Sequence, residues 1–222
     1  MNLSDRALRA LAIHGLTPDS LRDAAPERRR RAHAAAISLD DILEPGSIAL
    51  VTGPSGSGKS MILRALAQRL RAARRPVIDV GLDLVPARAR RRPLIDLMPG
   101  TVEAAMSVLA RAGLGEARVF ALPLLSLSDG QRARALLALA MARAAHAHPA
   151  PCTLLADEFA SNLDRTTAIA LARTVARWAR ASAARLVLAT AHDDLVEYLA
   201  PDVLLEQPLD TSPRLLIRRL AA

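Results

Sequence analysis

The segment that most constrains the fold is the octapeptide GPSGSGKS at residues 53–60, which matches the pattern G-x-x-x-x-G-K-[ST]. It lies between an apolar run expected to be a buried strand, Ile48 to Val51, and a helical pattern from about Gly58 to Ala73. In that context the glycines let backbone N–H groups wrap around a phosphate beside the positive end of a helix. The segment therefore predicts a phosphate-binding loop in an α/β fold.

Lys59 is the only lysine among the 30 lysine and arginine residues of the chain. A compact ammonium on a thin stem enters a phosphate cradle that a planar guanidinium does not fit, so Lys59 is expected to contact the β and γ phosphates of a nucleotide. The Ser60 hydroxyl is expected on Mg2+. A Gly/Ser-rich turn that happens to contain a lysine is the alternative, which the flanking strand and helix disfavour. The predicted nucleotide contacts in this segment are Gly53, Pro54, Ser55, Gly56, Ser57, Gly58, Lys59, Ser60 and Met61.

Two adjacent carboxylates, Asp157 and Glu158, end another apolar run at Thr153 to Ala156. In a parallel α/β sheet the ligand lies beyond the carboxyl ends of the strands, which places these acids next to the phosphate loop. Asp157 is a predicted Mg2+ ligand, and Glu158 a predicted general base that polarises the attacking water. His192 follows the run from Leu186 to Thr190 and is expected to contact the γ-phosphate, although a lone histidine is more often a surface or core residue.

The rest of the chain predicts a mainly parallel sheet with helices on both faces. Residues 1 to 36 are expected to be a helical lead-in, broken at Thr17-Pro18 and again at Ala25-Pro26. Residues 37–222 form the expected main domain, which begins with alternating apolar residues and a Pro45-Gly46 turn, and a helical subdomain is expected at about residues 93–146. The other predicted strands are Val77–Val80, Val203–Glu206 and Leu215–Arg218, and the other predicted helices Thr101–Ala112, Asp129–Ala145, Arg165–Ser182 and Asp194–Leu199.

The composition limits which partners and which cellular compartment are expected for the protein. The formal charge is +8, which indicates either a nucleic-acid or acidic-membrane partner or an arginine-rich surface that reflects biased base content. Aromatic residues make up 2% of the chain, which disfavours base-stacking platforms. No apolar run reaches the roughly eighteen residues of a membrane span, and neither a signal peptide nor an internal disulfide with the single Cys152 is expected. We therefore expect a cytoplasmic protein without membrane insertion.

The order of the motifs resembles that of ATP-binding cassette (ABC) ATPases: GPSGSGKS, then Leu127 to Gln131 (LSDGQ), then LLADEF, then Ser161 to Asp164 (SNLD), then His192. The resemblance implies a P-loop NTPase fold with a reduced helical ABC subdomain, ATP and Mg2+ as cofactors, and ATP hydrolysis. It also implies a homodimer on ATP binding, in which Ser128, Gly130 and Gln131 close the ATP site of the other copy. More narrowly, LSDGQRAR and TAHDDL are similar to a group of ABC-type ATPases sometimes fused to an acetyltransferase-like domain, an activity that would need a separate chain.

The chain departs from the family pattern at two places. Its only glutamines are Gln68, Gln131 and Gln207, so the glutamine expected between the second strand and the helical subdomain is missing. The first aromatic residue is Phe120, so no aromatic precedes the phosphate loop to stack on adenine. We expect arginine or histidine from Arg28 to His33 to stack there instead, with weak discrimination between ATP and GTP.

These observations favour a non-transport ABC ATPase whose ATP-driven dimer closure acts on a partner, either nucleic acid or a protein. The compact segment between Lys59 and Ser128 disfavours transport, as does the missing glutamine. One alternative is the nucleotide-binding subunit of a transporter, which needs a separate membrane subunit. Another is a non-catalytic ATP-binding switch, which the presence of Glu158 and His192 disfavours.

Overall fold

The computed structural model describes residues 3–15, 17–146, 151–209 and 213–217. A six-stranded sheet with the strand order β2-β3-β4-β1-β5-β6 forms its centre. Strands β1 to β5 run parallel, and β6 runs antiparallel to β5, so the expected mainly parallel α/β sheet is confirmed. Arg218, the last residue of the final predicted strand, lies outside the described residues. The strands are β1 (Ile48–Thr52), β2 (Val77–Asp79), β3 (Thr153–Ala156), β4 (Arg185–Thr190), β5 (Val203–Glu206) and β6 (Arg214–Ile217).

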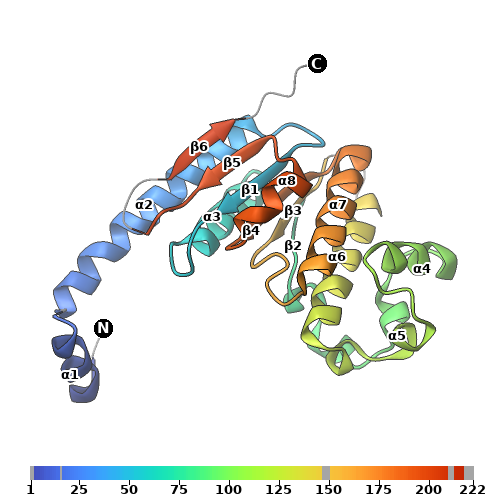
Figure 1. Cartoon of the computed structure of the whole chain (residues 1–222), viewed down its shortest axis with the longest axis horizontal. Helices are drawn as coiled ribbons and strands as arrows, with labels where there is room; N and C mark the ends of the chain where they lie inside the picture. The colour runs from blue at the N-terminus through green and yellow to red at the C-terminus, as the bar shows by residue number, and fades with distance from the viewer. Residues whose placement is uncertain (1–2, 16, 147–150, 210–212, 218–222) are drawn as a thin grey trace.

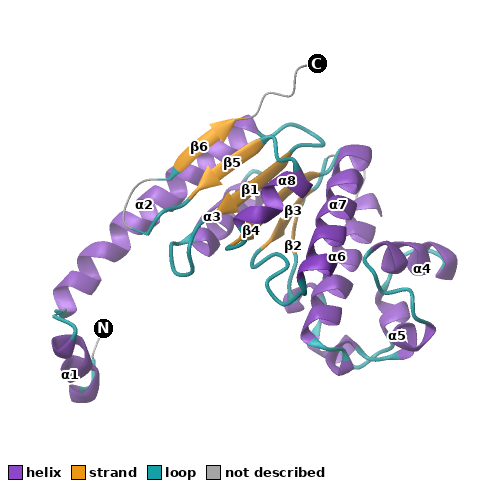
Figure 2. Cartoon of the chain, viewed as in Figure 1, coloured by secondary structure: helices purple, strands orange, loops and turns teal. Residues whose placement is uncertain are grey.

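Helices flank the sheet on both sides (Figure 2). Five 3-10 turns join them in the described chain: η1 (Leu82–Leu84), η2 (Ala87–Ala89), η3 (Leu94–Leu97), η4 (Leu124–Ser126) and η5 (Asp193–Leu195). The predicted helix at residues 194–199 is η5 followed by one short α-helix. The α-helices are α1 (Asp5–Ile13), α2 (Pro18–Ile42), α3 (Lys59–Ala72), α4 (Val102–Arg111), α5 (Ala117–Ala121), α6 (Asp129–His146), α7 (Arg165–Ser182) and α8 (Val196–Leu199).

The parallel strands are largely apolar, with polar residues only at their ends, because helices cover both faces of the sheet. Alternate residues of β1 enter different cores: Ile48 and Leu50 pack with α6 and α7, whereas Ala49 and Val51 pack with α2 and α3. All of β1 is consequently buried. The phosphate loop that follows β1 therefore leaves a rigid strand at the centre of the sheet.

Helix α2 corrects one expectation from the sequence. It runs without interruption from Pro18 to Ile42 with Pro26 inside it, so the break predicted at Ala25-Pro26 is wrong. A proline inside a helix removes one backbone hydrogen bond, but the part of α2 after Pro26 packs on α3, with Ala32, Ala36 and Leu39 buried in the shared core. This packing outweighs the lost bond. The apolar residues after Ile37 are likewise helical, so residue 36 is an interior position of α2.

A charged cluster fixes α2 to the sheet. The side chain of Asp40 is only 5% exposed and accepts a hydrogen bond from Arg69 Nε at 2.7 Å. Arg75 also pairs with Asp40, and Arg185 Nη1 lies 3.9 Å from its Oδ1. Burial alone would raise the pKa of Asp40, but the hydrogen bonds from Arg69 and Arg75 outweigh it and hold the pKa below the ordinary value. One carboxylate thus joins α2, α3 and β4.

The segment expected to be helical, residues 93–146, contains α4, α5 and α6 and no β-strand. Helix α5 was not predicted, because five residues are too few for a periodic apolar pattern. Arg134 Nη1 donates to the carbonyl of Gly113 at 2.6 Å, and Arg143 Nη1 donates to that of Leu84 at 2.8 Å. These bonds fasten α6 to the turns around it. In Figure 1, α4 and α5 lie outside the sheet, beyond α6.

Candidate functional site

The phosphate loop connects β1 to α3 through glycines in left-handed conformations. Gly53, Gly56 and Gly58 have φ of 144°, 78° and 104°. Gly58 is the N-cap of α3 and offers no side-chain capping bond, so the first N–H groups of the helix remain available to an anion. This is the geometry that a phosphate-binding loop requires. The predicted contact Met61 lies in the first turn of α3, where its N–H donates to Gly58 and its side chain packs against the apolar core.

Gly53 is fixed by a residue that sequence reasoning did not identify as part of the site. A Cβ at Gly53 would lie 2.1 Å from the carbonyl oxygen of Gln207, so only glycine fits. The Gln207 N–H donates to the carbonyl of Thr52 at 2.8 Å, which holds the end of β5 against the start of the loop. Gln207 is buried, and its position directly after a predicted strand was the available signal.

Lys59 folds back over the loop. Its Nζ donates to the carbonyl oxygens of Gly53 at 2.6 Å and Pro54 at 2.9 Å. Burial lowers the pKa of Lys59, and the nearby carboxylates of Asp157 and Glu158 partly oppose that shift. Both negative carboxylates therefore act on the ammonium of Lys59. This interaction connects the phosphate loop with the acids that follow β3.

The sheet order brings the acids to the loop. Strand β4 lies between β1 and β3, so the residues that follow these three parallel strands meet at one edge of the sheet. Asp157 and Glu158 are exposed there, and Asp157 Oδ1 accepts the N–H of Glu158 at 3.0 Å. Glu158 has φ of 50°, a left-handed conformation that is uncommon for a residue with a side chain. Such strain is concentrated at functional positions.

The donors present suit a magnesium ion. Ser60 and Asp157 line the same cavity of about 310 Å3, and both offer hard oxygen atoms. In the part of the chain that the structure describes, no three His, Cys, Asp or Glu side chains are grouped as a metal cage. Mg2+ commonly keeps several waters and takes few protein ligands beside phosphate oxygens. A hydroxyl and a carboxylate next to a phosphate loop fit that requirement.

His192 is exposed at the same edge and is held by Thr190. The His192 N–H donates to Thr190 Oγ1 at 3.1 Å, and this hydroxyl donates to the carbonyl of Phe159 at 3.0 Å. The Phe159 N–H in turn donates to the carbonyl of Ala189 at 2.8 Å. This network couples the turn after Glu158 to the turn that carries His192. Thr190 was not identified from the sequence, where it was only the last residue of a predicted strand.

The LSDGQ segment forms the start of α6 with reciprocal capping bonds. Ser128 Oγ accepts the N–H of Gln131 at 3.3 Å, and Gln131 Oε1 accepts the N–H of Ser128 at 3.1 Å. This arrangement is a capping box, which the spacing of serine and glutamine encodes. Because Ser128 Oγ acts as an acceptor in it, its hydroxyl proton remains free to be donated to an anion. Gln131, by contrast, already uses its side chain as a cap.

Gly130 is in close contact with the SNLD segment. A Cβ there would lie 2.9 Å from the carbonyl oxygen of Asn162 and 3.1 Å from Leu163 Cδ2. Asp164 ends this segment as the N-cap of α7 and accepts the N–H of Thr167 at 2.9 Å. The hydrogen bonds from Thr167 lower the pKa of Asp164. The tip of α6 and the SNLD segment therefore form one surface.

The predicted residues thus form two groups. The phosphate loop, Asp157, Glu158 and His192 share one edge of the sheet, whereas Ser128, Gly130 and Gln131 belong to α6. Helices α3 and α6 pack in different cores on opposite faces of the sheet. Among the described residues, no hydrogen bond or ion pair joins residues 128–131 to residues 53–60. Within one chain, no such bond therefore connects the start of α6 to the phosphate loop.

A protein-family model and curated ATP-binding proteins match this chain. Residues 43–199 match the family model described as AAA domain. The zinc import ATP-binding protein ZnuC of Paracoccus denitrificans (strain Pd 1222) is 32% identical over 179 residues, which cover 74% of this chain and 66% of that protein. The hemin import ATP-binding protein HmuV of Myxococcus xanthus (strain DK1622) is 27% identical over 184 residues, covering 70% and 68%. The chain spans about two thirds of the length of these curated relatives.

Solved structures show the same fold. The dimeric structure of MJ0796, a bacterial ABC transporter cassette, superposes with a TM-score of 0.60 at 21% identity, covering 81% of this chain and 88% of that one. An inward-facing structure of a putative metal-chelate type ABC transporter gives a TM-score of 0.56 at 20% identity, covering 80% and 74%. The similarity at these identities concerns the fold. In the described part of the present chain, no helix has the length and apolar character needed to cross a membrane.

Proposed function

Because the chain belongs to the ABC ATPases, we propose that it binds Mg-ATP and hydrolyses it at the interface of a head-to-tail dimer of two copies. The observation that carries this proposal is that α3, which begins at the phosphate loop, and α6, which begins in the LSDGQ segment, pack on opposite faces of one sheet. A nucleotide held by the phosphate loop of one copy is completed by the α6 tip of the other. The structure of MJ0796, a cassette with the same fold, is dimeric, which supports a dimer of the present chain.

The residues of this chain divide the work as follows. The backbone N–H groups of the loop and Lys59 hold the β and γ phosphates, once Lys59 Nζ exchanges its bonds to Gly53 and Pro54 for phosphate oxygens. Ser60 and Asp157 hold Mg2+, which supplies positive charge to the phosphates. Glu158 orients the attacking water and accepts its proton, and His192 contacts the γ-phosphate. Ser128 and Gly130 of the second copy donate to that phosphate from the start of a helix.

No aromatic residue precedes the phosphate loop to stack on the base of the nucleotide. The helix that precedes β1, α2, carries Arg28, Arg29 and His33 exposed on its surface. The proposed adenine contact from residues 28–33 requires stacking by a guanidinium or an imidazole. Because these groups read the ring face and not its hydrogen-bonding edge, ATP and GTP bind with similar affinity. A strong preference for ATP in a binding titration would contradict this part of the proposal.

We propose that the cycle of ATP binding and hydrolysis switches the state of a partner molecule and does not drive transport. The missing glutamine and the compact segment between Lys59 and Ser128 support this choice, and the partner is either nucleic acid or a protein. The nucleotide-binding subunit of a transporter is the second candidate, because the relatives named above are zinc and hemin import ATP-binding proteins. Isolation of the protein from its own cells separates the two: a co-purifying membrane protein supports transport.

Hydrolysis is tested with Glu158→Gln, which removes the proton acceptor but keeps the side-chain size. We expect retained ATP binding and loss of phosphate release. Glu44→Gln is the matched control, because Glu44 is exposed and precedes β1, at the opposite edge of the sheet from the phosphate loop. Phosphate release that is unchanged in Glu158→Gln would exclude Glu158 as the base.

A further inference from the structure

Helix α7 carries a basic face that the proposed ATPase cycle does not use. Four of its 18 residues are arginine, and none is aspartate or glutamate. Arg173, Arg177 and Arg180 follow one another at spacings of four and three residues, which places them on one side of the helix. All three are exposed. The side of α7 that is turned away from the core is therefore positively charged along its C-terminal half.

A groove of about 910 Å3 lies along this face, between α7 and residues 198–200 at the end of α8. The three arginines named above line it, and none of the described residues that line it carries a carboxylate. Apart from the arginines, its polar side chains are those of Thr174 and Tyr198. The groove is consequently a basic surface, and its chemistry is that of the guanidinium group.

Arg180 has a structural role at one end of the groove. Its guanidinium donates to Asp202 Oδ2 at 2.6 Å and to the carbonyl oxygens of Gly46 and Ala200, each at 3.1 Å. Asp202 in turn accepts the N–H of Ile48 at 2.7 Å. These bonds fasten the end of α7 to the starts of β1 and β5, so this end of the groove has a fixed shape.

Arg173 and Arg177 have no such role, because neither makes an ion pair within the described part of the chain. They are four residues apart, and like charges at this spacing repel each other and destabilise a helix. Both lie before the last turn of α7, so the negative end of the helix dipole does not account for them. Two uncompensated guanidinium groups in one groove favour a negatively charged ligand, and guanidinium binds phosphate through paired hydrogen bonds.

The other side chains of the groove indicate which phosphate ligand fits. Proteins hold single-stranded nucleic acid by stacking its bases on open aromatic rings. Tyr198 is the single tyrosine of the chain, and the guanidinium carbons of Arg173 and Arg165 already lie 5.0 and 6.0 Å from its ring centre. Recognition of RNA duplexes also uses the ribose 2′-hydroxyl, but the Thr174 hydroxyl already donates to the carbonyl of Ala170 at 2.9 Å. These features favour the phosphate backbone of a DNA duplex.

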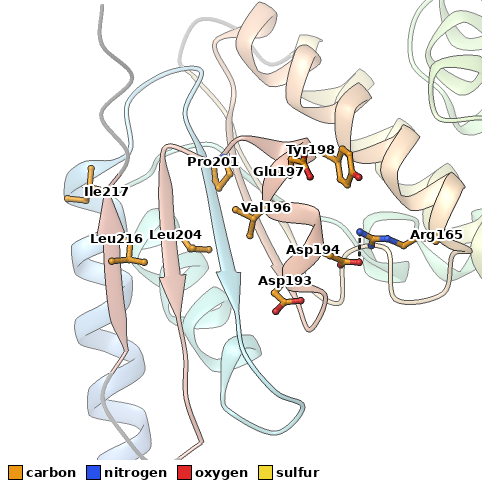
Figure 3. A pocket seen from close by; sticks show the side chains of 10 residues that line it. All are labelled: Arg165, Asp193, Asp194, Val196, Glu197, Tyr198, Pro201, Leu204, Leu216 and Ile217. Carbon is orange, nitrogen blue, oxygen red and sulfur yellow. Dashed lines mark ion pairs between the residues drawn. The ribbon is translucent and has the colours of Figure 1, made fainter.

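The adjoining groove, which shares Tyr198, limits where such a polyanion can lie. Asp193, Asp194 and Glu197 line it, and one arginine, Arg165, pairs with Asp194 there (Figure 3). Its excess of negative charge repels a phosphate backbone. The duplex therefore has to follow the C-terminal half of α7, away from the turn after β4.

We propose that Arg173 and Arg177 bind the phosphate backbone of double-stranded DNA, so that α7 is the surface through which the chain contacts its partner. The inference rests on the proposed function only for the role of DNA as the partner that is switched, because the binding itself requires neither ATP nor a dimer. Contacts to phosphate carry no base sequence, so the binding is independent of sequence and weakens steeply with salt.

The first test measures binding of the full chain, without nucleotide, to a fluorescent DNA duplex of about 30 base pairs by anisotropy, at salt concentrations between about 50 and 200 mM. Arg173→Gln together with Arg177→Gln should raise the dissociation constant by about tenfold or more and reduce the slope of log affinity against log salt by about 2. Lysine at both positions keeps the charges and most of the affinity. A wild type that binds no duplex at low salt, or a slope that the double variant leaves unchanged, would overturn the proposal.

Arg111→Gln together with Arg118→Gln is the matched control. It removes the same two charges from exposed positions on α4 and α5. These helices lie beyond α6, away from α8 (Figure 1). We expect the control to bind DNA nearly as tightly as the wild type. An equal loss in the control and in the groove variant would overturn the proposal, because the binding would then depend on net charge and not on the groove.

The second test locates the duplex by photo-cross-linking with bromodeoxyuridine in the DNA. We expect cross-linked peptides from residues 173–200. Helix α2 is the rival basic surface, since Arg28 and Arg29 are exposed on it, and cross-links confined to α2 would contradict the proposal. Tighter binding of the matching single strand or RNA duplex, or of phosphatidylglycerol vesicles, would contradict the choice of duplex DNA.

Failure of this proposal and failure of the proposed function give different results. We expect the Arg173→Gln and Arg177→Gln double variant to lose DNA binding and to keep phosphate release from ATP, and Glu158→Gln to do the reverse. A wild type that hydrolyses ATP but does not bind the duplex would overturn only the DNA proposal. A wild type that binds the duplex but releases no phosphate would overturn only the proposed ATPase cycle.

Discussion

Replacement of Gly53 by alanine is the substitution for which the structure gives the clearest magnitude. The new Cβ would lie 2.1 Å from the carbonyl oxygen of Gln207 and 3.2 Å from Ser57 Oγ, and the backbone φ at this position is +144°. The oxygen belongs to the backbone that pairs with Thr52, so it cannot turn away as a side chain could. Either the start of the phosphate loop or the end of β5 has to move.

Two costs add up in this variant. The backbone conformation costs about 1–3 kcal/mol for a residue with a side chain, and the forced displacement of packed atoms costs about 1–3 kcal/mol more. We therefore expect Gly53→Ala to lower the free energy of unfolding by about 4 kcal/mol. Gly56→Ala is the matched control, because Gly56 has φ of +78° but no atom within 4 Å of the built Cβ. Only the conformational cost of about 1–2 kcal/mol applies there.

Urea unfolding of the nucleotide-free protein measures the free energy of unfolding of both variants. Titration with a fluorescent ATP analogue measures their affinity for nucleotide. We expect the midpoint of Gly53→Ala to fall well below that of Gly56→Ala, with weaker ATP binding than the wild type. Equal midpoints for the two variants would show that the contact with Gln207 adds nothing to the cost of the backbone conformation, contrary to this expectation.

Three further predictions concern separate parts of the fold. Asp40→Asn removes the charged acceptor shared by Arg69 and Arg75 and lowers the free energy of unfolding by about 2 kcal/mol at neutral pH. Because the pKa of Asp40 is lowered from 3.8, this difference from the wild type persists above that pH and disappears as the pH falls through the folded-state pKa, which unfolding curves at several pH values would check. Burial raises the pKa of Cys152 to about 11, so iodoacetamide should modify it only after unfolding, and rapid labelling of the native protein at neutral pH would be inconsistent with its position. Ser128→Ala removes the N-cap of α6 and costs about 1 kcal/mol in urea unfolding, whereas Ser128→Thr keeps the hydroxyl and most of the stability.

The central sheet, and the placement of the residues that follow its strands at one edge, could be predicted from the sequence because both depend on local signals. Buried parallel strands are largely apolar, and the residues that follow them lie at one edge whatever the strand order. The capping box at Ser128 and Gln131 was also encoded by spacing, although only its contact with a second copy was expected. The continuity of α2 through Pro26 was not predictable, because packing on α3 outweighs a local helix-breaking signal.

Contacts between distant segments were beyond the reach of local patterns. The requirement for glycine at position 53 depends on the carbonyl of Gln207, and therefore on the pairing of β1 with β5. Thr190 acquires its role only because β4 lies beside β3. The position of Leu216 likewise depends on β6 turning back along β5.

The mass of Glu158→Gln with saturating Mg-ATP, measured by light scattering after gel filtration, shows whether nucleotide closes the proposed dimer. We expect a monomer without nucleotide and a stable dimer with ATP, because the phosphate loop of each copy meets the α6 tip of the other and hydrolysis no longer separates them. Adding Ser128→Arg should return the protein to the monomer. A protein that binds ATP tightly and nevertheless stays monomeric would contradict a site shared between two copies.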